Sequence, residues 1–333
     1  MSTGPRIIIT RPLAGDPVGL FHAAGFENVW CYPEDRRMPR AELLAAIAGA
    51  HAVVATPADT NINHEFFDAA GHQLIIVSNY AVGVDNIDLA EAARRGVIVG
   101  HTPDAVTEPT ADIAWLLLLA VAKRAYEGDS LVRSGTWAGV GPRQLLGQRV
   151  VGKTLLIVGA GRIGYAVARR ALAPGWNMTI LYHSRARHEE FERPPILGRF
   201  VSLEEGLGLA DFVSVHTPLT AETHHLINAE RLRQMKRSAV LINTSRGAVV
   251  DEAALVDALR ARTIAGAGLD VFEREPKLAP GLAELPNTFL LPHLGSATRE
   301  DREWMMRLAV DNAIAALKGE PVPHAYPLPT IVA

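Results

Sequence analysis

The sequence predicts an α/β protein of two domains, each built on a doubly wound parallel sheet. Three observations predict it: a length of 333 residues, an alternation of strand-length apolar runs with helical stretches, and a glycine-rich loop over residues 159–164. One hydrophobic core rarely grows beyond about 250 to 300 residues, so a chain of this length is expected to divide. The alternation is typical of parallel sheets that helices cover on both faces.

The first domain is predicted from four apolar runs of strand length within the first hundred residues. They lie at residues 6–10, 52–56, 73–78 and 97–100, and segments rich in alanine and leucine separate them. Short apolar runs that alternate with helical segments are typical of buried parallel strands. We therefore expect an open parallel sheet in this part of the chain.

A single long helix is predicted between the two domains. Residues 104–124 read DAVTEPTADIAWLLLLAVAKR, in which the threonine and aspartate residues favour a helix start. The apolar run at residues 115–122 is much shorter than the roughly 20 residues that a membrane span needs. We therefore expect a buried helix that bridges the domains rather than a membrane anchor.

The second domain is predicted from the alternation that resumes at Lys153. Strands are expected at residues 154–158, 178–182, 212–216, 239–243, 265–269 and 288–291, and Ser202 with Glu205 forms a helix-start pattern. A final amphipathic helix at residues 299–318 is expected to return to the first domain. We therefore predict a substrate domain of residues 1–103 and 298–333, and a dinucleotide-binding domain of residues 104–297.

Charge and cysteine content exclude several classes of function. With 33 basic and 36 acidic residues, the chain has no surplus of positive charge for nucleic acid or anionic lipid, so neither is expected as a partner. The single cysteine, Cys31, excludes an internal disulfide and a multi-cysteine metal site. We expect it to be buried and without a chemical role, and we expect no metal. The amino terminus shows no export signal, and a cytoplasmic location is predicted.

The loop GAGRIG predicts dinucleotide binding because it follows the strand TLLIVG and precedes the helical AVARRALA. In its G-x-G-x-x-G spacing, Gly159 permits the tight turn and Gly161 lets the backbone approach a pyrophosphate. Gly164 allows close packing of helix on strand, and the helix N–H groups face the anion.

The end of the following strand favours NADP(H), while NAD(H) stays possible. NAD-binding folds usually present an acid there to the ribose 2′-hydroxyl. This chain presents Ser184, Arg185 and Arg187 instead. Arginines in place of the acid suit a 2′-phosphate, which takes charge-assisted hydrogen bonds.

Polar residues also follow three later strands of the second domain. The segments are NTSRG with Arg246, GLDVFEREP with Asp270 and Glu275, and LPHLGSAT with His293. Ligands of parallel α/β sheets collect at the carboxyl ends of the strands, so these side chains are candidates for one site. An arginine can orient a carboxylate, and histidine is the side chain that exchanges protons near neutral pH.

Over nearly its whole length the chain resembles the family of D-isomer-specific 2-hydroxyacid dehydrogenases. The matching blocks are SNYAVGVDNIDL, HTPDAVTEPTADIAWLLLL, GAGRIG, VSVHTPLTAETHHLIN, LINTSRGAVVDEAAL, AGAGLDVFEREP and LPHLGSAT, in the family's order. The strand end YHSRAR looks most like the glyoxylate and hydroxypyruvate reductase branch. The resemblance implies a Rossmann cofactor domain inserted in a flavodoxin-like substrate domain, and a homodimer joined through the cofactor domain.

The resemblance also implies the roles of individual residues. Arg246 binds the substrate, His293 is the general acid and base, and Glu275 orients His293. The backbone N–H groups at Val82 and Gly83 bind the substrate carboxylate. The implied cofactor contacts come from Gly159, Gly161, Arg162, Ile163, Gly164, Ser184, Arg185, Arg187, Thr217, Pro218, Thr244 and Asp270.

The predicted activity is NADPH-dependent reduction of a small 2-keto acid, glyoxylate or hydroxypyruvate, to the D-2-hydroxy acid. Three alternatives stay open at this point. One is a reductase of larger 2-keto acids such as 2-ketogluconate, and another is a phosphonate dehydrogenase or other D-2-hydroxyacid dehydrogenase with the same catalytic residues. The third is a dinucleotide-sensing binding protein of the corepressor kind, whose purpose would be to bind the cofactor and not to turn over a substrate.

Overall fold

A computed structural model describes residues 4–57 and 61–330 of the chain. It divides into two compact units, and each is described here by itself. The first unit runs to Val106 and resumes at Ala297, and the second spans Thr107–Ser296. The assignment of one unit to the substrate and the other to the dinucleotide stays a proposal.

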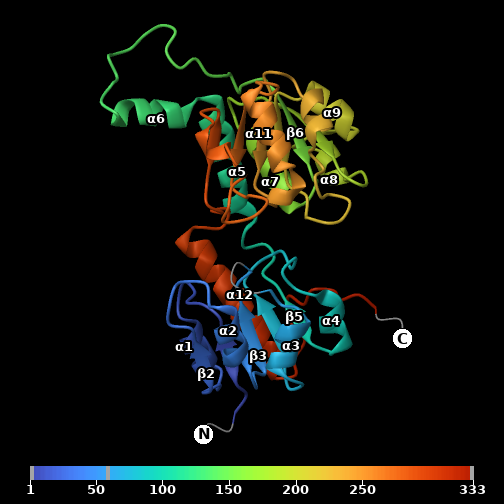
Figure 1. Ribbon diagram of the computed structural model, residues 1–333. Helices are drawn as coiled ribbons and strands as arrows, with labels where there is room; N and C mark the ends of the chain where they lie inside the picture. The colour runs from blue at the N-terminus through green and yellow to red at the C-terminus, as the bar shows by residue number, and fades with distance from the viewer. Residues whose placement is uncertain (1–3, 58–60, 331–333) are drawn as a thin grey trace. The chain divides into compact units, whose positions relative to one another are not determined.

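The first unit contains a five-stranded parallel sheet in the order β2-β1-β3-β4-β5 (Figure 1). Its strands are β1 (Ile7–Ile9), β2 (Val29–Cys31), β3 (Ala52–Ala55), β4 (Ile76–Asn79) and β5 (Ile98–Gly100). This order is the one found in flavodoxin-like doubly wound sheets. The sequence analysis missed β2, a half-exposed edge strand of three residues that pairs with β1 in register Ile7 to Val29.

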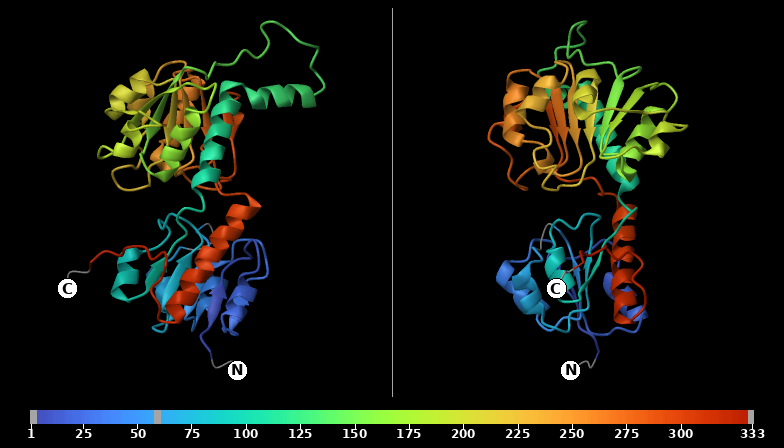
Figure 2. Two further views of the ribbon diagram at one scale, coloured as in Figure 1. Left: turned by 180° about the vertical axis from the view of Figure 1, so that it is seen from behind. Right: turned by 90° about the vertical axis from the view of Figure 1, so that its right-hand side faces the viewer.

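Helices cover both faces of this sheet, as the two views of Figure 2 show. They are α1 (Pro17–Ala23), α2 (Arg40–Ile47), α3 (His64–Ala70), α4 (Leu89–Arg94) and α12 (Arg299–Leu317). Because side chains alternate along a strand, Ile8 packs in the core with α2 and α3, while Ile7 and Ile9 pack in the core with α1 and α12. The final helix therefore belongs to the first unit, although the whole second unit precedes it in the chain.

The second unit contains a seven-stranded parallel sheet in the order β12-β11-β10-β9-β6-β7-β8. Its strands are β6 (Thr154–Val158), β7 (Thr179–His183), β8 (Arg199–Phe200), β9 (Phe212–Val215), β10 (Val240–Asn243), β11 (Gly266–Leu269) and β12 (Thr288–Leu290). This is the Rossmann order with one further strand, and the direction of winding reverses between β6 and β9. The predicted class of two doubly wound parallel sheets is confirmed. The two-residue edge strand β8 was not predicted.

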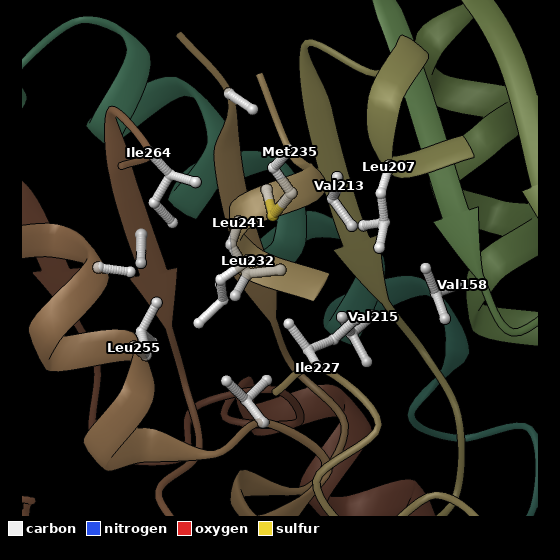
Figure 3. Close-up of a cluster of buried hydrophobic side chains, with 14 of the residues drawn as sticks. Val158, Leu207, Val213, Val215, Ile227, Leu232, Met235, Leu241, Leu255 and Ile264 are labelled. Carbon is white, nitrogen blue, oxygen red and sulfur yellow. The ribbon is translucent and has the colours of Figure 1, made fainter. Parts of the chain in front are cut away.

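Two buried clusters lie on the two faces of the second sheet. Leu155 and Ile157 pack with α5 (Thr107–Ala122) and α7 (Arg162–Ala171). Leu156 and Val158 point to the other face, where the cluster of Figure 3 includes Leu207. The remaining helices are α6 (Ala125–Arg133), α8 (Glu189–Glu192), α9 (Leu203–Leu209), α10 (Ala229–Gln234) and α11 (Glu252–Arg260), with short 3-10 turns at Gly247–Val249 and Leu282–Glu284.

The helix predicted over residues 104–124 is α5 in the structure, and a further helix, α6, follows it that was not predicted. Arg124 adopts a left-handed backbone conformation with φ of 55°, so α5 ends at Ala122 and α6 starts in a new direction (Figure 1). Large apolar side chains are exposed along α6 and the segment of residues 134–150, among them Tyr126, Val132 and Trp137. Among the described residues, no helix is both long and apolar enough to cross a membrane.

Cys31 is half-buried on β2 rather than fully buried as predicted. Edge strands expose one side of their backbone, which explains the difference. Burial still raises the pKa of its thiol. The absence of a chemical role for Cys31 and a cytoplasmic location both stay predictions.

Candidate active site

The glycine-rich loop lies at the point where the winding of the second sheet reverses. Gly159 has φ of 107°, and a Cβ atom there would lie 2.6 Å from the carbonyl oxygen of His216 at the end of β9. A Cβ on Gly164 would lie 2.2 Å from the carbonyl oxygen of Gly159. Both positions therefore need glycine, one for the turn and the other for close packing of α7 on β6.

The space beside this loop fits a dinucleotide phosphate. A Cβ on Gly161 would meet no atom within 4 Å, and no side chain caps the start of α7, whose first residues are Arg162 and Ile163. Among the described residues, the Thr217 hydroxyl is buried without a hydrogen-bond partner, and its backbone nitrogen lies against Gly159. An uncapped helix start and an unpartnered buried hydroxyl both suit an anion.

His216 is a feature of this region that the sequence analysis did not single out. Its Nε2 lies 2.8 Å from the Ser214 hydroxyl and its Nδ1 lies 3.4 Å from the Thr244 hydroxyl. Burial of the ring lowers the pKa of His216 to about 3, so the ring is neutral at physiological pH. Thr244, predicted as a cofactor contact, thus lies next to a neutral imidazole, and Pro218 follows in the same loop.

The predicted 2′-phosphate residues lie on the turn after β7, and their surroundings differ. Arg187 pairs through Nε with Glu192 at 2.9 Å, and its guanidinium lies 5.5 Å from the centre of the Phe200 ring. The Ser184 hydroxyl donates to the backbone of its own turn, at Ala186. Arg185 is exposed. Arg187 is therefore held by the protein, and Arg185 is the cation of this turn that is better placed to meet a phosphate.

Glu275 and His293 form a hydrogen-bonded pair. The Glu275 Oε2 atom lies 3.0 Å from Nδ1 of His293, and Oε1 accepts from the backbone N–H of Phe272 at 3.0 Å. Burial raises the pKa of Glu275, but the His293 hydrogen bond and charge, the Phe272 N–H and the charge of Arg246 outweigh it. The pKa of Glu275 is therefore lowered, and the residue is a carboxylate at neutral pH.

The backbone around His293 is held by a buried aspartate. Asp270 accepts from the N–H of Leu294 at 2.7 Å through Oδ1 and from the N–H of Gly295 at 2.8 Å through Oδ2. The Thr110 hydroxyl on α5 donates to the Gly295 carbonyl at 2.8 Å. His293 itself has φ of 57°, an uncommon conformation that such contacts stabilise. Asp270 thus contacts this loop directly, and its predicted place beside the nicotinamide stays a prediction.

Arg246 follows β10 and contributes a cation near the pair. Its Nη1 donates to the Ser245 carbonyl at 2.8 Å, and its own carbonyl accepts from the Asn243 side chain at 2.9 Å. Since β6, β10, β11 and β12 are parallel, the groups that follow them share one edge of the sheet. The structure thus brings Arg246, Glu275 and His293 to the same edge as the glycine-rich loop.

Val82 and Gly83 lie in the first unit, in the half-buried loop that follows β4. Their role as carboxylate donors stays a prediction. Within the part of the chain that the structure describes, no group of three or more histidine, cysteine or acidic residues could hold a metal ion.

Comparison with known proteins identifies the family. The model described as "D-isomer specific 2-hydroxyacid dehydrogenase, NAD binding domain" matches residues 115–295. The glyoxylate reductase of Thermococcus kodakarensis is 49% identical over 323 residues, which is 96% of this chain and 95% of that protein.

Two solved structures have the same fold. The TT0316 protein of Thermus thermophilus superposes with a TM-score of 0.89 at 46% identity, covering 96% of this chain and 99% of that one. The NADPH-dependent glyoxylate/hydroxypyruvate reductase of Sinorhizobium meliloti, in complex with NADP and malonate, gives a TM-score of 0.84 at 33% identity. That match covers 99% of this chain and 100% of the other.

Proposed function

This chain belongs to the D-isomer-specific 2-hydroxyacid dehydrogenase family, and on that premise we propose that it reduces glyoxylate to glycolate, and hydroxypyruvate to D-glycerate, with NADPH. The names of its relatives support the substrates. The observation that carries the proposal is the Glu275 and His293 pair on the same sheet edge as the glycine-rich loop.

The dinucleotide would lie with its phosphates at the start of α7, beside Gly161 and the Thr217 hydroxyl. The backbone N–H groups of Arg162 and Ile163 would face those phosphates. When bound, the nicotinamide supplies the hydride that reduces the carbonyl carbon.

Arg246 and the N–H groups of Val82 and Gly83 would hold the substrate. A guanidinium presents a planar fork of donors that suits a carboxylate or a keto oxygen, and it polarises the carbonyl for hydride attack. Backbone N–H groups can donate hydrogen bonds to the carboxylate oxygens without the entropy cost of ordering a flexible side chain. The substrate would thereby be oriented before any bond changes.

His293 would give the proton that completes the reduction. A carboxylate only accepts hydrogen bonds, so the contact with Glu275 requires a proton on Nδ1 of His293. The nitrogen left for the substrate is Nε2, and its proton passes to the carbonyl oxygen as the hydride reaches the carbon. The side chain of His293 is 52% exposed in this structure, so solvent can restore the proton.

A panel of 2-keto acids with NADPH and with NADH tests this proposal, reported as kcat/KM. We expect glyoxylate and hydroxypyruvate to exceed 2-ketogluconate, and NADPH to exceed NADH. A preference for 2-ketogluconate or oxidation of a phosphonate would support those alternatives instead. Tight NADPH binding without turnover of any 2-keto acid would contradict the proposed reductase activity and favour the dinucleotide-sensing binding protein.

The cofactor preference is tested by a double variant, Ser184→Asp with Arg185→Ala. An aspartate there would repel a 2′-phosphate and accept from the ribose hydroxyls of NADH. We expect the ratio of kcat/KM for NADPH over NADH to fall by roughly 10- to 1000-fold, since each lost or gained contact is worth on the order of 1 to 2 kcal/mol. Arg187→Ala is the comparison, and because Arg187 is held by Glu192 it should change the ratio less. An unchanged ratio in the double variant would contradict the assignment.

We further infer a homodimer joined through α6 and residues 134–150. Exposed large apolar side chains gather on this part of the second unit, and Figure 2 shows it extending from the seven-stranded sheet. Contiguous exposed apolar side chains are typical of protein interfaces. Sedimentation at micromolar concentration should give a dimer, and a monomer would contradict the inference.

A further inference from the structure

The loop that follows β4 has three successive backbone carbonyls fixed by donors from the ends of β4 and β5. The pairs are Ala81 with the N–H of Thr102 at 2.8 Å, Val82 with Nδ1 of His101 at 3.0 Å, and Gly83 with the Asn79 amide at 2.8 Å. Strands β4 and β5 are parallel neighbours, so their carboxyl ends meet and bring these donors together. Asn79 is fully buried and Thr102 is fully buried.

Fixing the carbonyls also fixes the direction of the N–H groups. In a planar trans peptide, the carbonyl of one residue and the N–H of the next point in opposite directions. The Ala81 carbonyl therefore sets the N–H of Val82, and the Val82 carbonyl sets the N–H of Gly83. Within the described residues, neither of these two N–H groups donates to a protein acceptor. They are two adjacent, aimed donors of the kind that bind anions.

Of these three contacts, only the one from His101 is made by a side chain that comes from the end of the neighbouring strand β5. A backbone carbonyl only accepts, so the contact with Val82 requires the proton of the His101 ring to lie on Nδ1. Asn79 is the last residue of β4 and bonds to the loop that directly follows its own strand, four residues on at Gly83. His101 is thus the group through which β5 sets the direction of the Gly83 N–H.

His101 is itself held by the carboxyl-terminal tail and α12. Its N–H donates to the His324 carbonyl at 3.0 Å, and its carbonyl accepts from the Asn312 amide at 2.9 Å. The Tyr326 ring meets the His101 ring edge to face at 5.2 Å between centroids. Asn312 is fully buried, and its oxygen accepts from the His324 N–H at 3.0 Å. The tail therefore covers the free edge of β5 and orients the imidazole.

We propose that His101 is a positioning residue that aims the N–H of Gly83 at the substrate carboxylate, with Tyr326 and the tail holding His101 in place. This inference rests on the proposed function, because the ligand of the loop is the carboxylate of a 2-keto acid. His101 touches neither the reacting carbonyl nor the cofactor in this account. Its loss should therefore weaken binding of the carboxylate in ground state and transition state alike.

The test compares His101→Phe, which keeps an aromatic ring against Tyr326 but has no donor, with His101→Asn, whose amide can donate to the Val82 carbonyl. For His101→Phe we expect KM for glyoxylate, and the inhibition constant of the unreactive analogue oxamate, to rise roughly tenfold. We expect kcat and KM for NADPH to stay within about twofold, because neither chemistry nor cofactor is touched. His101→Asn should recover most of the wild-type KM.

Several outcomes would overturn the proposal. An unchanged KM in His101→Phe would do so, as would a fall in kcat with no change in KM, or a His101→Asn variant as impaired as His101→Phe. If wild type reduces no 2-keto acid, the proposed function fails first, and that result is visible before any variant is made.

A measurement on the unmodified protein covers the case in which His101→Phe does not fold. Nitrogen-15 labelling of the histidines distinguishes the two imidazole tautomers by NMR, and the His101 signal is the one absent from His101→Asn. We expect the proton on Nδ1. A proton on Nε2 alone would overturn the contact with Val82 and the proposal with it.

Discussion

The loop of residues 293–295 and the loop of residues 81–83 each lie at the carboxyl edge of their own parallel sheet, yet they carry chemistry in different ways. In the first, the proposed functional group is the His293 side chain, and Asp270 and Thr110 hold the backbone beneath it. In the second, the proposed functional groups are backbone N–H donors, and His101 and Asn79 hold the carbonyls behind them. The first arrangement depends on a side chain with its own chemistry, whereas the second depends on backbone atoms that nearly every residue carries.

The largest effect is expected at the side chain of the first loop. His293→Ala removes the proposed proton donor, and kcat for glyoxylate should fall by roughly 10²- to 10⁴-fold with little change in NADPH affinity. Steady-state kinetics with glyoxylate measure kcat, and a binding titration measures the affinity for NADPH. His72→Ala, which removes an exposed histidine of the first unit, is the control and should leave kcat unchanged. A near-wild-type kcat in His293→Ala would remove His293 from the mechanism.

The next effect tests whether the first loop depends on its buried anchor. Asp270→Asn leaves one of the two N–H groups, of Leu294 or Gly295, without an acceptor, so His293 should shift and kcat should fall on the order of 10- to 100-fold. Asp257→Asn changes an exposed aspartate of α11 and serves as the matched control. If Asp270→Asn lowered the melting temperature but left kcat intact, the anchor would be structural only.

A third effect concerns His216, the histidine that follows β9 and whose ring is buried. Burial holds the folded-state pKa of His216 near 3, below the unfolded value of about 6.5. As pH falls below about 6.5 the unfolded chain takes up a proton that the folded chain refuses, so stability is lost progressively down to about pH 3.

His216→Gln keeps a donor toward Ser214 and removes this titration. Between about pH 6 and 4, wild type should lose about 1.4 kcal/mol of unfolding free energy per pH unit relative to the variant. Urea unfolding at several pH values measures the difference. Parallel curves for the two proteins would show that His216 is not buried in the neutral form.

The smallest effect concerns the tail behind the second loop. Tyr326→Leu removes the ring that contacts His101 but leaves the hydrogen bond to Val82, so KM for glyoxylate should rise about two- to threefold at constant kcat. Tyr326→Phe keeps the ring and should behave as wild type. A Tyr326→Leu variant with unchanged KM would separate the tail from the proposed role of His101.

Much of the fold could be predicted from the sequence, and so could the placement of Arg246, Glu275 and His293 at one edge of the second sheet. Long buried strands carry continuous apolar runs, as in β6 at Thr154–Val158, and the G-x-G-x-x-G spacing follows from steric needs that are local in the chain. The edge strands β2 and β8 were missed because they are short and only partly buried. Helix α6 was not predicted because its residues are only half-buried or exposed and carry no buried apolar stripe.

The supports of the two loops could not be predicted for a different reason. Thr110 meets Gly295 across 185 positions of sequence, and Asn312 meets His101 across 211. Such contacts depend on tertiary packing and leave no spacing pattern. Thr110 and His101 lie in blocks that resemble the family, but the resemblance assigned neither of them a role.

The central claim is that one loop transfers the proton while the other binds the carboxylate, and paired steady-state kinetics of His293→Ala and His101→Phe test it most directly. With glyoxylate varied at saturating NADPH, the account predicts a large fall in kcat with little change in KM for His293→Ala. It predicts a rise in KM of roughly tenfold with nearly constant kcat for His101→Phe. If both variants changed the same parameter, the division of labour between the loops would be contradicted.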